Sequence, residues 1–291
     1  MAPKAPALRR APLAGGGGEL LAASTPTAPP PQSATSRNVG NFHANEDRVL
    51  VGSGRLWLQD SCEVEYLVAG VVDGHGDSAA CDLIAERALP ILAEHLEASL
   101  GDVVPALEGA FAELEELCLA LDPPSGACVC LCVIGGDRVF TVNVGDCRAV
   151  ALSFDGEAFA LSADQRCGDG AEYARIVEAG GAVVGNAVEG LMPARTLGDA
   201  DVKRICPPRV ILAEPEITVW EGRGVILLAS DGVWDTMGSG EALAIIPHKG
   251  RGLRRAASEA GPMLGVAERV LEEALRRGAQ DDVTVCVAVA A

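Results

Sequence analysis

The sequence predicts an α+β fold built on antiparallel sheets. Six segments rich in β-branched and apolar residues, bounded by Gly or Asp, are typical of strands. They occupy residues 65–73, 127–134, 137–144, 148–154, 224–230 and 283–290. Helical patterns occupy residues 78–99, 104–121 and 265–278. Because strands and helices come in blocks and do not alternate one by one, segregated layers are favoured over a parallel sheet.

The first two helical patterns follow each other directly between the first and second strands. We expect Asp77 to cap the first helix and Pro90 to kink it. Pro105 is typical of a helix start, because its missing N–H lies where no intrahelical acceptor exists. The third pattern, "GVAERVLEEALRRG", ends at Gly278, a residue type that commonly terminates helices.

Residues 1–38 differ in composition from the rest of the chain. They are rich in Ala, Pro, Gly, Ser and Thr, with the runs Gly15–Gly18 and Pro29–Pro31. Such a segment buries too little apolar surface to offset its ordering entropy, so we expect it to be disordered. Its basic residues also fit an organelle transit peptide, which would replace a cytoplasmic or nuclear location by a chloroplast or mitochondrion. Residues 39–291 show no second linker and are expected to form one domain.

Charge and cysteine usage exclude several classes of function. The formal net charge of −18 argues against a nucleic-acid partner, which is bound through Lys and Arg. No apolar run approaches the ~20 residues of a membrane-spanning helix, and we expect a monomer. The ten cysteines include no CxxC pair, so neither a zinc site nor a disulfide framework is indicated. Cys128, Cys130 and Cys132 alternate along one strand and are expected to be small buried hydrophobes on one face.

Five aspartates, spread over the whole chain, lie where apolar strands begin or end. They are Asp47, Asp73, Asp146, Asp231 and Asp281. Each one alone is best explained as a turn residue. Together, beside buried strands, they would repel one another unless a cation lay among them. Mg²⁺ and Mn²⁺ prefer such oxygen ligands, so the pattern indicates a hard-cation site if the sheets bring these ends together.

The sequence contains an ordered series of motifs that resembles the metal-dependent Ser/Thr protein phosphatases of type 2C, the PPM family. They are "NEDR" (45–48), "VVDGHGD" (71–77), "SGACV" (125–129), "VNVGDCRAV" (142–150), "EYARIVEAGGAV" (172–183), "ARTLGD" (194–199), "ILLASDGVWDTM" (226–237) and "GAQDDVTV" (278–285). The series spans essentially all of residues 41–291. The resemblance implies a central β-sandwich of two antiparallel sheets flanked by pairs of α-helices, with a two-metal centre at one edge.

By motif position, the resemblance implies which residues would hold two Mg²⁺ or Mn²⁺ ions. Asp73 matches the ligand that bridges both ions, and Gly74 matches a ligand that binds through its carbonyl. Asp231 and Asp281 match ligands of the first ion. Asp47 matches a ligand of the second ion, together with Glu46, which would act through water. A third, weaker ion would be held by Asp146 and Asp235 together with Asp231.

The resemblance also implies the chemistry. Hydroxide bridging the two ions would attack the phosphorus of phosphoserine or phosphothreonine in a protein substrate. His75 matches the general acid that protonates the leaving alkoxide, and its ordinary pKa of about 6.5 suits that role.

Three positions depart from the family pattern. Phe42 lies near the place of the phosphate-binding arginine, and His43 is the only candidate cation there. Asp282 stands where Asn is frequent, and "SADQRC" (162–167) replaces a commoner Asp-His-x-Pro. The missing arginine motivates an alternative function, a catalytically weak pseudophosphatase that binds phosphoproteins or acts as a scaffold. A hydrolase of small phosphoesters is a third interpretation.

Overall fold

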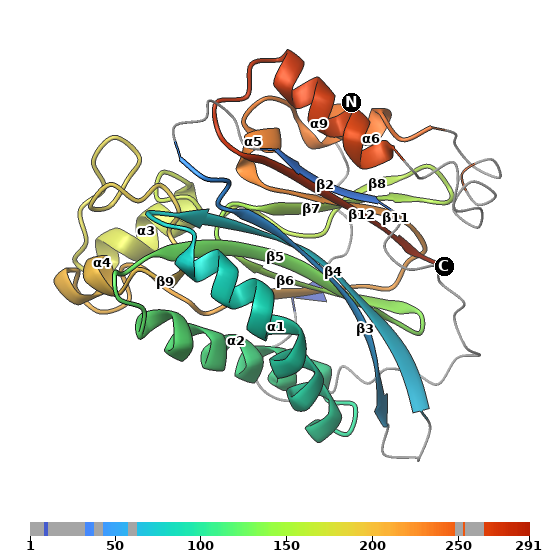
Figure 1. Ribbon diagram of the computed structural model, residues 1–291, viewed down its shortest axis with the longest axis horizontal. Helices are drawn as coiled ribbons and strands as arrows, with labels where there is room; N and C mark the ends of the chain where they lie inside the picture. Colours follow the sequence, from blue (N-terminus) through green and yellow to red (C-terminus); the bar gives the residue numbers. More distant parts are fainter. Residues whose placement is uncertain (1–8, 11–32, 38–42, 58–62, 248–252, 254–264) are drawn as a thin grey trace.

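Two antiparallel β-sheets lie face to face in the computed structural model, which describes residues 9–10, 33–37, 43–57, 63–247, 253 and 265–291 (Figure 1). The first sheet has the strand order β1-β10-β6-β5-β4-β3, with β9 paired to β5. Its strands are β1 (Arg9–Arg10), β3 (Asp47–Trp57), β4 (Glu63–His75), β5 (Gly126–Gly135), β6 (Arg138–Val144), β9 (Leu197–Gly198) and β10 (Glu216–Trp220). The second sheet has the order β2-β12-β11-β7-β8. Its strands are β2 (Ser33–Arg37), β7 (Arg148–Ser153), β8 (Ala158–Ala160), β11 (Gly224–Ala229) and β12 (Val283–Ala290).

Helices cover the outer face of each sheet, which confirms the predicted α+β sandwich. The helices are α1 (Ala79–Ala98), α2 (Val103–Leu119), α3 (Gly170–Glu178), α4 (Ala200–Ile205), α5 (Asp231–Trp234), α6 (Ser239–Ala244) and α9 (Val266–Arg276). The pair α1 and α2 lies on the first sheet, and α5, α6 and α9 lie on the second (Figure 1). Within the described residues, no helix is both long and apolar enough to span a bilayer.

The alternation of side chains along β5 explains why the sandwich has three hydrophobic layers. Cys128, Cys130 and Cys132 point into the space between the sheets, as expected, and all three are buried. Val129 and Leu131 point to the opposite face and pack under α1 and α2. A strand buried on both faces reads as a continuous apolar run, and β5 has no exposed residue.

One short strand of the second sheet comes from residues 1–38, the segment expected to be disordered. This strand, β2, pairs with β12 from Arg37 opposite Val283 to Ser33 opposite Val287. The segment "SATSR" has no apolar periodicity and therefore no strand signal of its own. Its strand is a backbone addition to the edge of β12, which composition does not reveal. Most of the remaining residues before 39 lie outside the described part of the chain.

The strand β3 was not predicted, and its glycines explain why. Gly52 and Gly54 interrupt the apolar pattern, and glycine inside a strand lowers its propensity. In the structure both make room for neighbouring side chains. A Cβ at Gly52 would lie 2.9 Å from Leu89 Cδ1, and one at Gly54 would collide with the Tyr66 hydroxyl. Helix α1 continues through Pro90.

Candidate active site

The predicted metal-ligand aspartates come together at one edge of the sandwich, where strands of both sheets end. On the first sheet, Asp47 at the start of β3 is directly opposite Asp73 on β4. On the second sheet, Asp231 follows β11 and opens α5, while Asp281 precedes β12, the antiparallel neighbour of β11. The backbone N–H of Asp231 points to Asp73 Oδ2 at 3.5 Å, across the gap between the sheets.

Hydrogen bonds through Ser230 and Asp282 join the two sheets at this edge. Ser230 Oγ donates to Asp47 Oδ2 at 2.9 Å and accepts from the Thr284 N–H, also at 2.9 Å. The backbone N–H of Glu46 donates to Asp282 Oδ2 at 2.9 Å. Sequence reasoning missed Ser230, although it directly precedes Asp231. The Asp that stands in place of the frequent Asn at 282 thus serves as an acceptor between the sheets, a role that a carboxylate can fill.

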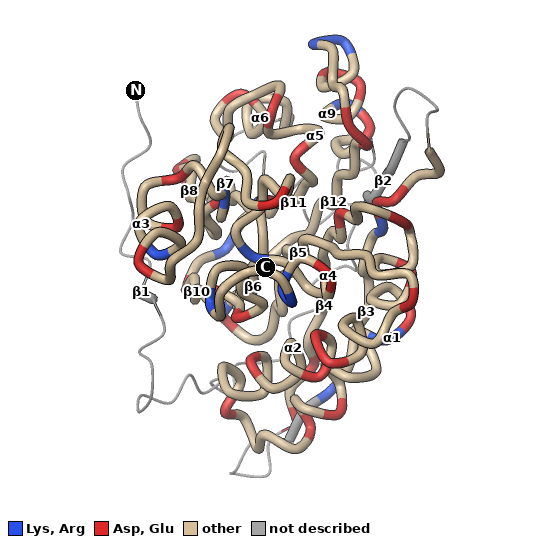
Figure 2. Tube along the Cα trace, turned by 90° about the vertical axis from the view of Figure 1, so that its left-hand side faces the viewer, with Lys and Arg blue, Asp and Glu red and all other residues tan. Residues whose placement is uncertain are grey.

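Burial makes these carboxylates costly to ionise. Burial is the largest cause that raises the pKa of Asp47, to about 7, with repulsion from Asp282 and Asp281 adding to it and hydrogen bonds from Thr284 and Ser230 opposing it. Burial also raises the pKa of Asp231 to about 8, and repulsion from Asp146, Asp235 and Asp281 acts in the same direction. The pKa of Asp73 is raised well above its usual range by burial and by the surrounding aspartates. Because Asp and Glu are spread over the whole molecule (Figure 2), burial and not abundance distinguishes this cluster.

The carboxylates around Asp47 and Asp73 fit a bound cation. Asp47 is 3% exposed, and its Oδ1 has no hydrogen-bond partner in the described structure. A buried, unpartnered carboxylate oxygen is unfavourable unless a cation neutralises it. Gly74 lets the backbone approach closely, because its N–H donates to Glu46 O at 3.2 Å and a Cβ would lie 2.8 Å from that oxygen. Among the described residues, no group of three or more His, Cys, Asp or Glu side chains is arranged so that it could hold a metal ion.

His75 lies at the end of β4, two residues beyond Asp73, and is held by Asp199. Its Nε2 lies 2.9 Å and 3.0 Å from the two carboxylate oxygens of Asp199. Because a carboxylate only accepts, His75 Nε2 carries the proton in this contact. Burial lowers the pKa of His75, but the hydrogen bond and charge of Asp199 outweigh it, so the pKa is raised.

The backbone of Asp199 is held in place beside His75. Its backbone has a φ of 52°, in the left-handed region, and its N–H donates to Ser125 O at 3.0 Å. A Cβ at Gly126 would collide with the Asp199 carboxylate, so the glycine leaves room for that side chain. The motif "ARTLGD" contains Asp199, but sequence reasoning assigned it no role.

Asp146 and Asp235, the residues expected to hold a third ion with Asp231, surround the guanidinium of Arg166. Arg166 Nε lies 3.0 Å from Asp146 Oδ2, while its Nη2 lies 3.2 Å from Asp231 Oδ2 and 2.8 Å from Asp235 Oδ1. Arg166 belongs to the motif "SADQRC", which the sequence marked only as a departure from the family pattern.

The remaining predicted residues lie at the rim of the site. Asp281 is exposed, and its Oδ1 accepts from the Asp282 N–H at 2.7 Å. Glu46 is partly buried, and burial raises its pKa. His43 is exposed, with Nδ1 3.9 Å from the Glu46 carboxylate. A backbone hydrogen bond with Ala44 is the main cause that raises the pKa of His43. Phe42 lies outside the described residues.

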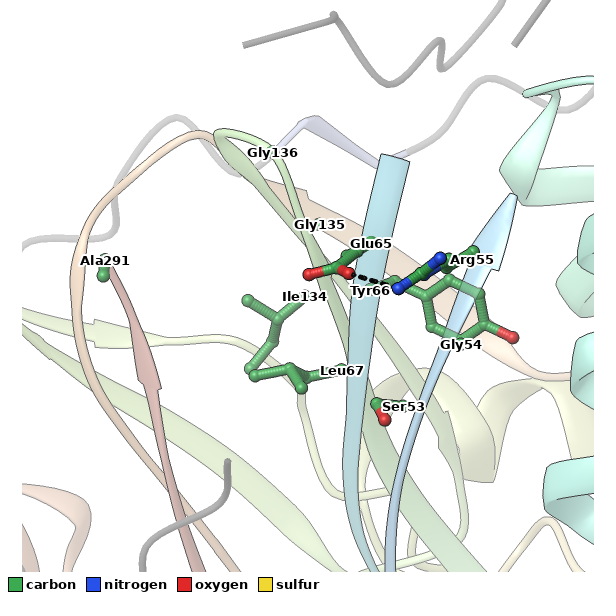
Figure 3. Close-up of a pocket in the computed structure, with 10 residues that line it drawn as sticks. All are labelled: Ser53, Gly54, Arg55, Glu65, Tyr66, Leu67, Ile134, Gly135, Gly136 and Ala291. Carbon is green, nitrogen blue, oxygen red and sulfur yellow. Dashed lines mark ion pairs between the residues drawn. The ribbon is translucent and has the colours of Figure 1, made fainter. Parts of the chain in front are cut away.

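A pocket of about 420 Å³ lies at the other ends of the same strands (Figure 3). It is lined by Arg55, Glu65, Tyr66, Ile134 and Ala291, among others. Glu65 and Asp73 are eight residues apart on β4, which corresponds to roughly 26 Å of extended strand. In this pocket Arg55 is paired with Glu65 at 3.2 Å, and the pocket lies too far along the strands to take part in the aspartate cluster.

Comparison with known proteins identifies a family to which this chain is similar. The family model described as "Protein phosphatase 2C" matches residues 34–283. "Probable protein phosphatase 2C 14" of Arabidopsis thaliana is 35% identical over 189 residues, which cover 62% of this chain and 41% of that protein. "Protein phosphatase 1L" of Bos taurus is 28% identical, with 76% of this chain and 63% of that protein covered. The chain spans about half the length of several curated relatives that it matches.

Solved structures share the fold at low sequence identity. "Crystal structure of a phosphatase from a pathogenic strain Toxoplasma gondii" superposes with a TM-score of 0.68 and 20% identity, covering 88% of this chain and 91% of that chain. "Structure of a C.elegans sex determining protein" superposes with a TM-score of 0.71 and 21% identity, covering 89% and 64%.

Proposed function

The chain belongs to the protein phosphatase 2C family, and on that premise we propose that it is an Mg²⁺- or Mn²⁺-dependent phosphatase that hydrolyses phosphoserine and phosphothreonine in proteins. One observation carries the proposal. Buried carboxylates from both sheets meet at one edge of the sandwich, and one of their oxygens, Asp47 Oδ1, is buried without a hydrogen-bond partner. Such a cluster is stable at neutral pH only when cations bind to it or when protons do.

The chain offers oxygen ligands for two ions at this edge. They are the carboxylates of Asp47, Asp73, Asp231 and Asp281, the carbonyl of Gly74 and, through water, the carboxylate of Glu46. Bound ions of this kind would lower the pKa of a coordinated water, so that it can attack phosphorus near neutral pH. The hydrogen bond from Ser230 Oγ holds Asp47 Oδ2 in place and leaves Asp47 Oδ1 available to an ion.

His75 is proposed as the general acid that protonates the leaving serine or threonine oxygen. Its place at the end of β4 puts it beside the proposed bridging ligand, Asp73. The hydrogen bond to Asp199 favours the protonated ring, and a general acid must carry its proton at the working pH. Asp199 itself is buried and orients the ring from the side of β9.

A pseudophosphatase that binds phosphoproteins without turnover is the second candidate function. It is favoured by the missing arginine near Phe42, which leaves His43 as the candidate phosphate-binding cation at that point of the chain. The retained aspartates favour the enzyme, because a binding module has no need of a buried, mutually repelling carboxylate cluster.

Metal-dependent turnover tests the proposal. Purified protein is assayed on p-nitrophenyl phosphate and on a phosphothreonine peptide, with Mn²⁺ or with EDTA. We expect turnover with Mn²⁺, none with EDTA, and a loss of at least about 100-fold in Asp73→Asn and Asp231→Asn. Asp102→Asn, which removes an exposed carboxylate at the start of α2, is the matched control and should retain full turnover.

Equal residual activity in all samples would refute the enzyme. Phosphopeptide binding by the wild type without turnover would support the pseudophosphatase instead. Turnover of p-nitrophenyl phosphate and small phosphoesters, with none of the phosphopeptide, would point to a hydrolase of small substrates.

A further inference from the structure

Arg166 provides a fixed cation at the carboxylates of Asp146, Asp231 and Asp235. Each of the three carboxylates has an oxygen within 2.8–3.2 Å of a guanidinium nitrogen. The guanidinium is planar, remains charged at every relevant pH and presents several donors, so one arginine can serve three acceptors at once. The pairs also differ in depth, because Asp146 is 2% exposed whereas the side chain of Asp235 is 51% exposed. Arg166 therefore contacts the whole cluster, from the buried Asp146 to the exposed Asp235.

The same carboxylate oxygens cannot hold Arg166 and a divalent ion together. A Mg²⁺ ion requires its oxygen ligands at about 2.0–2.1 Å in octahedral geometry, and it would lie where the guanidinium now contacts these oxygens. Arg166 is attached to the chain, so it does not dissociate and its effective concentration at the cluster is high. A weakly bound third ion would have to displace it and leave a half-buried guanidinium without its partners.

The nearby Arg148 is engaged by other residues and does not neutralise these carboxylates in place of Arg166. Arg148 is paired with Asp164 at 2.6 Å, and its guanidinium lies over the Trp234 ring at 4.8 Å from the centroid. The backbone also holds Arg166 in place, because the segment around it forms a bridge with Pro193. We propose that Arg166 occupies the place of a third divalent ion, so that this chain binds two ions and not three.

The proposal rests on the proposed function, because it concerns the ion count of that metal centre. It separates the carboxylates of the edge into two groups. Asp47, Asp73 and Asp281 remain available to ions, whereas Asp146 and Asp235 are neutralised by the chain itself. Asp231 is shared, since its Oδ2 contacts Arg166.

Counting bound Mn²⁺ at equilibrium tests the inference without an activity assay. Metal-free protein is dialysed against Mn²⁺ up to millimolar concentration, and bound ion is counted by elemental analysis and by loss of the free-ion electron paramagnetic resonance signal. We expect two ions per chain for the wild type and three for Arg166→Leu. Arg195→Leu is the matched control, because Arg195 is a similarly half-buried partner of a carboxylate, Glu172, outside the site. It should bind two ions.

The outcomes separate the inference from the proposed function. Three ions in the wild type would overturn the inference, and so would two ions in a folded Arg166→Leu. No bound Mn²⁺ in the wild type would overturn the metal centre itself. If Arg166→Leu does not fold, as judged by circular dichroism, Arg166→Gln replaces it with the same expectation of three ions. Arg166→Lys retains a positive charge and should bind two.

Discussion

Asp47→Asn should make the metal-free protein more resistant to unfolding as the pH rises, relative to the wild type. The substitution keeps the shape of the side chain and an acceptor for Ser230 Oγ, but it removes the charge. Asp47 is nearly fully buried, and burial raises its pKa to about 7 from an ordinary 3.8. In the absence of ions, the ionised carboxylate is therefore less favourable in the folded state than in the unfolded state.

The size of the effect follows from the two pKa values. A folded pKa above the unfolded one means that the proton-linked stability is complete below pH 3.8 and is lost as the pH rises through 7. Of the roughly 3.2 pKa units between the two values, the stability that corresponds to about 1.2 units is lost by pH 5 and nearly all of it by pH 8. At about 1.36 kcal/mol per unit, the free energy of unfolding should fall by about 2.7 kcal/mol between these pH values through Asp47 alone. Asn has no proton to lose, so the variant lacks this fall.

Urea unfolding in EDTA at pH 5 and pH 8 measures this double difference. Any constant cost of the buried amide cancels, because it is the same at both pH values. The advantage of Asp47→Asn over the wild type should grow by about 2.7 kcal/mol from pH 5 to pH 8. Asp102→Asn, an exposed change of the same charge, controls for net charge. An advantage that does not change with pH would refute the reasoning, and saturating Mn²⁺ should reverse it by stabilising only the wild type.

Three further changes test other parts of the structure. His75→Ala should lower kcat by about 100-fold with the Mn²⁺ count unchanged; an unaltered kcat across pH would contradict the role of general acid. Glu172→Gln should cost about 3 kcal/mol at pH 7, because it breaks the half-buried pairs with Arg175 and Arg195. Burial raises the pKa of Glu172, but the two arginines outweigh it, so the pKa is lowered. The stability that the ionised Glu172 contributes is therefore present above pH 4.5 and is lost as the pH falls through the folded pKa. In urea titrations, the difference between Glu172→Gln and the wild type should shrink over the same pH range. Gly232→Ala should lower stability by about 1–3 kcal/mol, since a Cβ would collide with Asp282 O, whereas Gly240→Ala, with nothing within 4 Å, should not.

Strand positions and the aspartates beside them could be predicted from the sequence because they depend on local patterns. The apolar run before Asp73 and the glycine after it are visible without any knowledge of the fold. The pairing of the sheet edges is not local, so Ser230 was missed although it contacts Asp47, 183 residues away. Asp199 reaches His75 over 124 residues for the same reason. Arg166 was visible only as an unusual residue in a motif, because its partners lie in two distant segments, Asp146 in one and Asp231 and Asp235 in the other.

The two kinds of cation at this edge differ in what they can do for the chain. A tethered guanidinium neutralises Asp146 and Asp235 at all times and cannot be removed, so it serves the stability of the fold. The exchangeable ions proposed at Asp47 and Asp73 would be able to bind water and substrate as well as the protein, so only they could serve the chemistry. Asp231 belongs to both groups through its two oxygens. The first ion and Arg166 would therefore share the charge of one carboxylate, that of Asp231. By linkage, any change that weakens the pair of Arg166 and Asp231 should alter the affinity of the first ion by a corresponding factor.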